Sequence, residues 1–180
     1  SPLRKALMDS GLGSDTIGGG ISGSLRQATF STGLKGVELA DAEKVEPLVL
    51  ATLAEMDDDG IDAKMIEAAI NTIEFSLREN NTGSFPRGLS LMIGALRSWV
   101  YGHDPLEALE FEKPLTAVKT QLAADPAYLQ DLIRQYLLSN NHRLTLTLEP
   151  DPELQARLEA EEKAKLTAVK ARLNERQIQD

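Results

Sequence analysis

Apolar residues recur at the spacing of an α-helix along most of this chain. Such a stripe, with three or four residues between successive apolar positions, places one face of a helix toward a core. It predicts helices over residues 2–9, 41–57, 62–79 and 84–101. Two further helices are expected to begin at Asp104-Pro105 and Asp125-Pro126, because Asp caps a helix and Pro fits its first turn.

Two segments alternate between apolar and polar residues instead, which is typical of half-buried strands. In residues 27–37, Phe30 and Leu34 fall on one face, and in residues 142–149 three leucines do so at every second position. We expect the two strands to lie in one sheet, covered by the helices between them. Residues 13–24, rich in Gly and Ser, are expected to form a loop.

The last predicted helix, over residues 152–178, carries only a thin apolar stripe padded with alanines. Such a helix cannot bury itself within this chain, and it is expected to need a second helix alongside it. The chain also begins inside one predicted helix and stops inside another. The sequence therefore predicts a section of a larger protein.

The composition fits one globular domain or slightly more, since the chain has 180 residues, of which 42% are hydrophobic and 26% charged. Residues 41–80 hold 11 acidic and 3 basic side chains, so that segment contributes −8 of the net charge of −9. This sign is opposite to what phosphate neutralisation needs, and aromatic residues are only 4%, so nucleic-acid binding is not expected. We interpret the acidic segment as a solvated face of two helices.

Cysteine is absent, which excludes disulfides and thiolate metal sites. No apolar stretch approaches the ~20 residues that span a bilayer, and no secretory signal is visible. The sequence therefore gives no indication of a membrane partner.

Two glycine motifs resemble known binding loops without their context. Residues 18–23 match G-x-G-x-x-G, but no apolar strand precedes them and no helix follows, so a flexible loop is expected. Residues 57–60 begin like a calcium loop, but Ile66 would fall at the position of the last ligand. An acidic helix end is the better interpretation there.

The remaining candidate residues lack partners for catalysis. His103 and His142 are the only histidines, neither lies in an H-E-x-x-H or H-x-x-E-H motif, and both are expected in turns. Ser84 and Ser90 have no evident catalytic base. From its residues alone, the chain is thus a helix-rich α+β protein without a complete active site, and we assign no catalytic, cofactor-binding or metal-binding residue.

Several longer runs of sequence resemble the presequence-protease branch of the pitrilysin/insulinase zinc metallopeptidases. They occur in the order of that family and cover nearly the whole chain. They are residues 10–13 (SGLG), 29–37 (TFSTGLKGV), 68–75 (AAINTIEF), 77–80 (LREN), 80–92 (NNTGSFPRGLSLM), 99–101 (WVY), 104–109 (DPLEAL) and 146–152 (LTLEPDP).

The resemblance implies a central section of a much longer peptidase that cleaves unstructured peptides in an enclosed chamber. In such proteins each half has two α+β domains, in which helices cover an antiparallel sheet, and a helical hairpin joins the halves. Residues 1–150 would be the C-terminal part of the second domain, and residues 151–180 the first arm of the hairpin. This section would form part of the chamber wall and of the hinge between the two halves, and it would be inactive on its own.

The family's zinc ligands lie in an H-x-x-E-H motif that nothing in this chain matches, so zinc is expected in the full-length protein and not in this section. The partners implied are peptide substrates and the remaining domains of the same chain. The location implied is the cytoplasm in a bacterium, or an organelle in a eukaryote. The alternative function is a non-catalytic helical interaction module or an inactive relative of the family.

Overall fold

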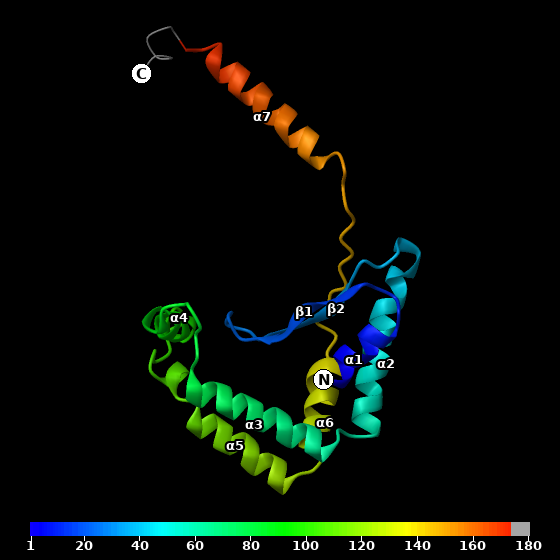
Figure 1. Ribbon diagram of the computed structural model, residues 1–180, viewed down its shortest axis with the longest axis vertical. Helices are drawn as coiled ribbons and strands as arrows, with labels where there is room; N and C mark the ends of the chain where they lie inside the picture. The colour runs from blue at the N-terminus through cyan, green and yellow to red at the C-terminus, as the bar shows by residue number, and fades with distance from the viewer. Residues whose placement is uncertain (174–180) are drawn as a thin grey trace. The chain divides into compact units, whose positions relative to one another are not determined.

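A computed structural model describes residues 1–173 and divides the chain into two compact units, residues 1–144 and residues 145 onward. In chain order the elements are α1 (Pro2–Asp9), β1 (Asp15–Ser22), β2 (Thr29–Lys35), η1 (Leu39–Lys44), α2 (Val45–Asp58), α3 (Ala63–Glu79), α4 (Arg87–Trp99), η2 (Glu107–Leu109), α5 (Glu112–Ala124), α6 (Tyr128–Ile133), η3 (Arg134–Leu138) and α7 (Leu154–Lys170) (Figure 1). The many helices and the small antiparallel sheet confirm the α+β class. Within residues 1–173, none of the helices combines the length and hydrophobicity that crossing a bilayer would require.

The core of residues 1–144 is small and draws on elements far apart in the sequence. It consists of Leu3, Leu7, Leu34, Leu53 and Ile133, which come from α1, β2, α2 and α6. Further apolar residues of α2 and η3 pack around it while remaining partly exposed. The core therefore joins α1, at the start of the chain, to α6, which lies about 130 residues later in the sequence.

The start of α2 differs from the expectation in detail. A six-residue 3-10 helix, η1, precedes it, so α2 begins at Val45 instead of residue 41. Asp41, within η1, accepts a hydrogen bond from the Lys44 ammonium at 2.5 Å. Pro47 lies in the first turn of α2, where its missing N–H leaves no helical bond unmade, as the sequence requires.

Helix α3 begins and ends at the residues that the sequence predicts. The Asp62 carboxylate accepts a hydrogen bond from the backbone N–H of Lys64 at 2.7 Å, which caps the first turn. At the other end Asn80 adopts the left-handed conformation, with φ of 44°, and stops the helix.

The glycine-rich residues after α1 form a strand, so the loop expected over residues 13–24 is wrong. β1 pairs antiparallel with β2, from Asp15 opposite Lys35 to Ser22 opposite Thr29, with an irregularity between Ile17 and Gly20. Gly18 has φ of +90° and Gly20 has φ of +70°. These conformations let β1 bulge, and the pairing register with β2 shifts by one residue across the irregularity.

The strand expected over residues 142–149 is also wrong, and so is its expected place in one sheet with the strand over residues 27–37. Within the described residues the sheet has two strands, β1 and β2, and residues 142–149 belong to no helix or strand. Alternation alone does not make a strand, because a strand also needs a neighbouring strand to pair with.

Three helices in the second half of the chain, α4, α5 and α6, begin later than expected, and α6 begins at Tyr128 instead of Asp125-Pro126. Residues 104–111 contain only the turn η2, and α5 begins at Glu112. The Asp104 carboxylate accepts a hydrogen bond from the N–H of Leu106 at 2.8 Å, so it caps this turn and not a long helix. Helix α4 begins at Arg87, directly after Pro86, and Ser84 does not cap it.

The second unit contains α7, which confirms a helix within the predicted range 152–178; residues 174–178 of that range lie outside the described residues. Before the helix, the Asp151 carboxylate pairs with the Arg157 guanidinium at 2.6 Å. This hydrogen bond, followed by that from the Glu153 N–H, lowers the pKa of Asp151. No side chain of α7 is buried, so its thin apolar stripe is exposed within this unit.

Candidate functional site

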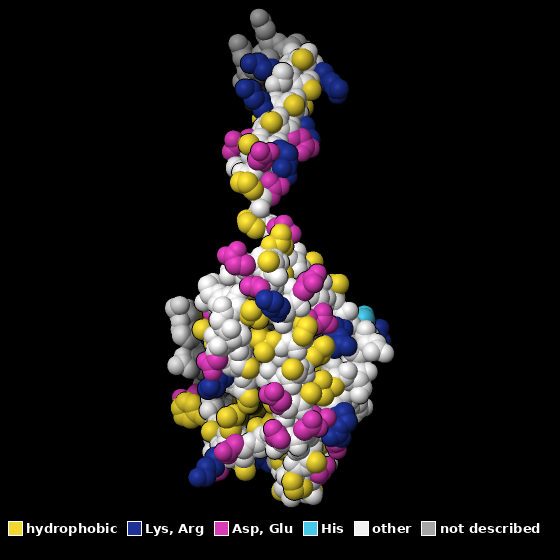
Figure 2. Space-filling model, turned by 90° about the vertical axis from the view of Figure 1, so that its right-hand side faces the viewer, with side chains coloured by type: hydrophobic (Ala, Val, Ile, Leu, Met, Phe, Trp, Pro, Cys, Tyr) yellow, Lys and Arg dark blue, Asp and Glu magenta, His cyan; other side chains and the backbone are white. Residues whose placement is uncertain are grey.

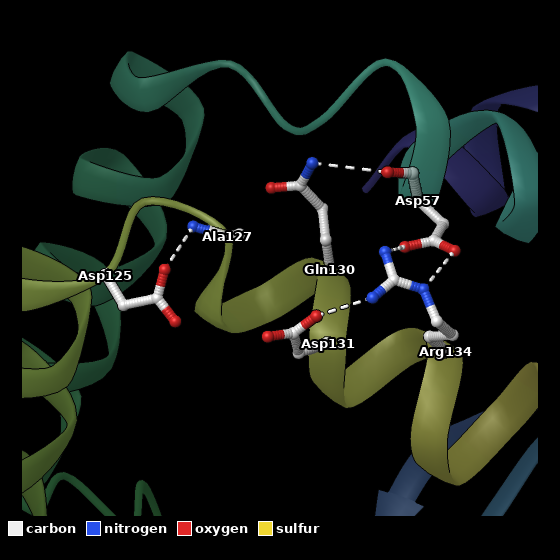
Figure 3. A network of polar contacts seen from close by, with 6 residues as sticks. All are labelled: Asp57, Asp125, Ala127, Gln130, Asp131 and Arg134. Carbon is white, nitrogen blue, oxygen red and sulfur yellow. Dashed lines mark hydrogen bonds and ion pairs between the residues drawn. The ribbon is translucent and has the colours of Figure 1, made fainter.

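A polar network joins the end of α2 to α6 and η3 (Figure 3). Arg134 donates two hydrogen bonds to the Asp57 carboxylate, at 3.0 and 2.7 Å, and a third to Asp131 at 2.6 Å. Gln130 donates to the backbone carbonyl of Asp57 at 3.2 Å. The bidentate geometry fixes the orientation of both side chains, so this network sets how α6 meets α2.

In this network the positive charge of Arg134 lies beside two negative charges, those of Asp57 and Asp131. The side chain of Asp57 is only 11% exposed, while that of Arg134 is 54% exposed. The hydrogen bond with Asp57 is the main cause that raises the pKa of Arg134, and attraction to Asp131 contributes less. Asp57 is therefore a structural residue of the helix junction.

A second network joins α3 to α5, which run side by side (Figure 1). Glu74 on α3 accepts hydrogen bonds from Arg78, at 2.9 and 3.0 Å, and from Lys119 on α5. Arg78 also approaches Glu112 at 3.6 Å and lies 5.8 Å from the ring centre of Phe111. Glu74 thus connects cations from both helices, and α3 and α5 are held together by charge.

Replacing Glu74 by Gln is expected to destabilise this pair of helices in a pH-dependent way. The hydrogen bond from Lys119, followed by that from Arg78, lowers the pKa of Glu74 below its ordinary 4.5. A carboxylate whose pKa is lower in the folded than in the unfolded state stabilises the fold at pH values above the unfolded pKa. This stabilisation is lost as the pH falls through the folded pKa. Glu74→Gln should therefore lower the melting temperature by a few degrees at pH 7 and have no effect well below pH 4.

The matched control is Glu67→Gln, an exposed carboxylate on the same helix for which residues 1–173 show no ion pair. Thermal unfolding followed by circular dichroism from pH 3 to pH 8 measures both variants. Equal losses in the two variants, or a Glu74→Gln loss that persists at pH 3, would contradict the role of Glu74.

The apolar stripes of α3 and α4 lie on the predicted helices, but no core covers them. Neither helix has a buried residue. On another face of the chain, seen from the side on which α2 lies, hydrophobic and acidic side chains are also interspersed (Figure 2). The exposed large apolar residues on these helices and the turns beside them include Ile73, Phe75, Met92, Trp99, Val100 and Leu106. Exposed apolar residues are available for contacts with other parts of a protein, so this set of residues, which we call the α3–α4 surface, is the candidate functional site.

The candidate catalytic residues, His103, His142, Ser84 and Ser90, lie in different segments of the chain. His103 lies in the turn after α4, where its N–H donates to the Ser98 carbonyl at 3.3 Å. His142 follows η3, and its N–H donates to the Asn140 side chain at 2.8 Å. Ser90 is part of α4, while Ser84 is exposed before it. None of these residues is brought to a base, an oxyanion donor or another histidine by the contacts recorded for residues 1–173.

The described residues do not fit the zinc ion that the sequence resemblance implies. Peptidase zinc sites use three side-chain ligands and leave one position for water. In residues 1–173 no three His, Cys, Asp or Glu side chains gather closely enough to hold a metal ion. The assignment of no catalytic or metal residue stays a prediction.

Sequence reasoning missed the two ion-pair networks. The partners are far apart in the chain, 77 residues for Asp57 and Arg134 and 45 for Glu74 and Lys119. Nothing local distinguishes Asp57 from the two aspartates that follow it. The spacing of Glu74 and Arg78, four residues apart, and that of Asp131 and Arg134, three residues apart, were the local signals for these networks.

No model of a known protein family matches the chain. Among curated proteins, presequence protease 1 of Arabidopsis thaliana, described as chloroplastic/mitochondrial, is 47% identical over 99% of this chain. Protein HypA of Clostridium perfringens is 36% identical over the whole chain, and the mitochondrial presequence protease of Mus musculus is 36% identical over 89% of it.

These matches cover only part of each relative. The chain corresponds to 17% of the Arabidopsis protein, 18% of the Clostridium protein and 16% of the mouse protein. The similarity nevertheless extends over nearly all of this chain, in relatives from plants, animals and bacteria. Over this limited section of its relatives' length, the chain belongs to the presequence-protease family.

Proposed function

We propose that the chain is a non-catalytic section of a zinc-dependent metalloendopeptidase that degrades unstructured peptides in an enclosed chamber. The observation that carries this proposal is the 47% identity to a presequence protease over 99% of the chain. The match covers only 17% of that relative, so in this proposal the catalytic residues lie in the part of the full-length protein outside the match.

The described residues support a structural role for this section. The carboxylates with the clearest contacts, Asp57 and Glu74, hold helices together through arginine and lysine and are not gathered around a cavity. The α3–α4 surface offers apolar side chains for packing against other domains, as a chamber wall requires. In this proposal residues 1–150 form the end of a pitrilysin-type domain.

Helix α7 suits a hinge between two halves of such an enzyme. It has 17 residues, which corresponds to roughly 25 Å, and it buries no side chain within its own unit. In the proposal residues 151–180 are the first arm of a helical hairpin, and the exposed leucines of α7 contact the second arm.

The zinc ligands and the residues that grip the peptide would come from other parts of the full-length protein. When bound, the zinc ion would supply Lewis-acid activation of the attacking water. The partners of this chain are then peptide substrates and the remaining domains. Its location would be an organelle in a eukaryote, as the names of the Arabidopsis and mouse relatives state for those proteins, or the cytoplasm in a bacterium.

The test compares peptide cleavage by residues 1–180 alone with cleavage by the full-length protein that contains them. The probe is an unstructured peptide with a fluorophore and a quencher at its ends, and a chelator provides the control. We expect chelator-sensitive turnover by the full-length protein, and neither turnover nor stoichiometric zinc in residues 1–180.

Two results would overturn the proposal. Chelator-sensitive cleavage with one zinc ion per chain by residues 1–180 would show that this section is catalytic. Failure of the zinc-loaded full-length protein to cleave any unstructured peptide would favour an inactive relative that acts as an interaction module.

A further inference from the structure

The helix α6 continues into an unusual turn, η3. Over Arg134–Leu138 the backbone is π-helical, and the Ser139 N–H donates a hydrogen bond to the Arg134 carbonyl, five residues earlier, at 2.8 Å. In an α-helix the same N–H would bond to Gln135, four residues earlier. Turns of this kind are rare and occur mostly singly within α-helices, frequently at functional sites. The side chains around η3 must therefore favour this turn over an ordinary α turn.

The π turn lets two consecutive leucines face one core. Leu137 and Leu138 both pack against the core cluster that includes the buried Ile133. Successive residues of an α-helix lie about 100° apart around its axis, so an α turn would place Leu137 about 40° from Ile133 and Leu138 about 140° from it. A π turn contains roughly one more residue, so Leu138 also comes back toward the direction of Ile133. Packing of Leu138 thus favours the π turn.

The side chain of Arg134 fixes the point from which this turn starts. Its guanidinium bonds the Asp57 carboxylate, at the end of α2, through two nitrogens at 3.0 and 2.7 Å (Figure 3). A bidentate pair of this kind fixes the orientation of both groups. The first residue of η3 is therefore held to α2, which also contributes Leu53 to the core.

A second contact ties the chain beyond η3 to the other end of α2. The Arg143 side chain approaches the carboxylate of Glu46, in the first turn of α2, at 3.8 Å. The residues from Arg134 to Arg143 are thus attached at both ends to the same helix, with η3 between the attachments. A change from a π turn to an α turn would therefore move these residues relative to α2.

We infer that η3 is a two-state register switch held by the Arg134–Asp57 pair. With the pair formed, the turn is π-helical and Leu138 packs on the core. With the pair broken, the turn becomes α-helical, Leu138 leaves the core, and the residues that follow rotate by about 100° around the helix axis. Backbone hydrogen bonds are made in both states, so side-chain contacts decide between them. A displacement of the end of α2 is thereby transmitted to the chain beyond η3.

Single cysteines test the exposure of the two leucines, because the chain contains no cysteine of its own. Leu137→Cys and Leu138→Cys are made separately in residues 1–180, and the rate of alkylation by a maleimide is measured under native conditions. Adding Arg134→Gln should raise the rate of Leu138→Cys by roughly 10-fold and leave that of Leu137→Cys within about twofold, because only residue 138 turns away from the core.

Two further substitutions separate the link to α2 from the contacts within α6. Asp57→Ala removes the partner on α2 and should act as Arg134→Gln does. Asp131→Asn removes only the local partner of Arg134, which it bonds at 2.6 Å, and should leave both alkylation rates unchanged. Circular dichroism at 222 nm establishes that each variant keeps its helices. If Arg134→Gln unfolds, Asp57→Ala takes its place, since it leaves α6 and η3 unaltered.

A crystal structure of the Arg134→Gln variant measures the switch directly. The Ser139 N–H should then bond to the carbonyl of residue 135 instead of that of residue 134. Retention of the longer bond, or unchanged alkylation of Leu138→Cys, overturns the inference, since packing alone would then hold the turn.

Two other results also contradict the switch. Equal acceleration of Leu137→Cys and Leu138→Cys would mean that the whole junction loosens without a change of register. An effect of Asp131→Asn as large as that of Asp57→Ala would mean that Arg134 acts within its own helix. The inference concerns contacts within residues 1–144, so none of these results depends on whether the full-length protein cleaves peptides.

Discussion

Replacing Leu7 by Ala should lower the free energy of unfolding of residues 1–144 by about 2–5 kcal/mol, the usual range for a buried leucine. Leu7 is 1% exposed and is the large side chain that the described core encloses most completely. Its loss leaves a cavity between α1 and the elements that pack on it. For a unit of this size the melting temperature should fall by roughly 5–15 °C.

The adjacent residue on α1 provides the control. Met8 is 48% exposed, so Met8→Ala removes a side chain of similar size with little loss of packing. Thermal unfolding at neutral pH, followed at 222 nm, measures both variants. Similar losses in the two would show that α1 contributes by helix propensity and not through the core.

Replacing Gly18 by Ala should be the second most damaging change. Its φ of +90° is a conformation that residues with a Cβ rarely adopt, and an added Cβ would lie 2.5 Å from the Ser31 carbonyl oxygen and 2.7 Å from the Thr32 Cα. These atoms belong to the backbone of β2 and cannot rotate away. Strain and overpacking together should cost about 2–5 kcal/mol and distort the β1–β2 pairing.

Gly19→Ala is the matched control at the next position. An added Cβ there meets no atom within 4 Å, and the backbone is not in the left-handed region. Amide chemical shifts and hydrogen exchange of residues 15–35 report on the hairpin, and thermal unfolding reports on the whole unit. An unchanged hairpin in Gly18→Ala would contradict the observed bulge.

Local signals in the sequence were sufficient for most helices. Helix α3 was predicted at both ends because Asp62 caps it and Asn80 stops it, and both effects act within one turn. The position of Pro47 likewise constrained the first turn of α2. These features depend on neighbouring residues only, so a single sequence contains them.

Features that depend on distant partners could not be predicted in this way. The glycines of β1 suggested a loop, because their pairing depends on β2 and on a bulge at Gly18 and Gly20. The alternation over residues 142–149 suggested a strand, but a strand also needs a neighbouring strand, which local alternation does not reveal. The ion pairs of Asp57 with Arg134 and of Glu74 with Lys119 also join elements far apart in the chain. The exposure of the α3–α4 surface depends on which elements pack against these helices, and their own sequence does not show this.

The position of the core residues along the chain has a consequence for biosynthesis. Leu3 and Leu7 share one core with Ile133, so this core cannot close until about 130 further residues have left the ribosome. At ~5–20 residues per second, this interval lasts roughly 6–26 s. During that time α1, α2 and the β1–β2 hairpin lack α6, the helix that completes their core, so part of this apolar surface stays accessible to chaperones.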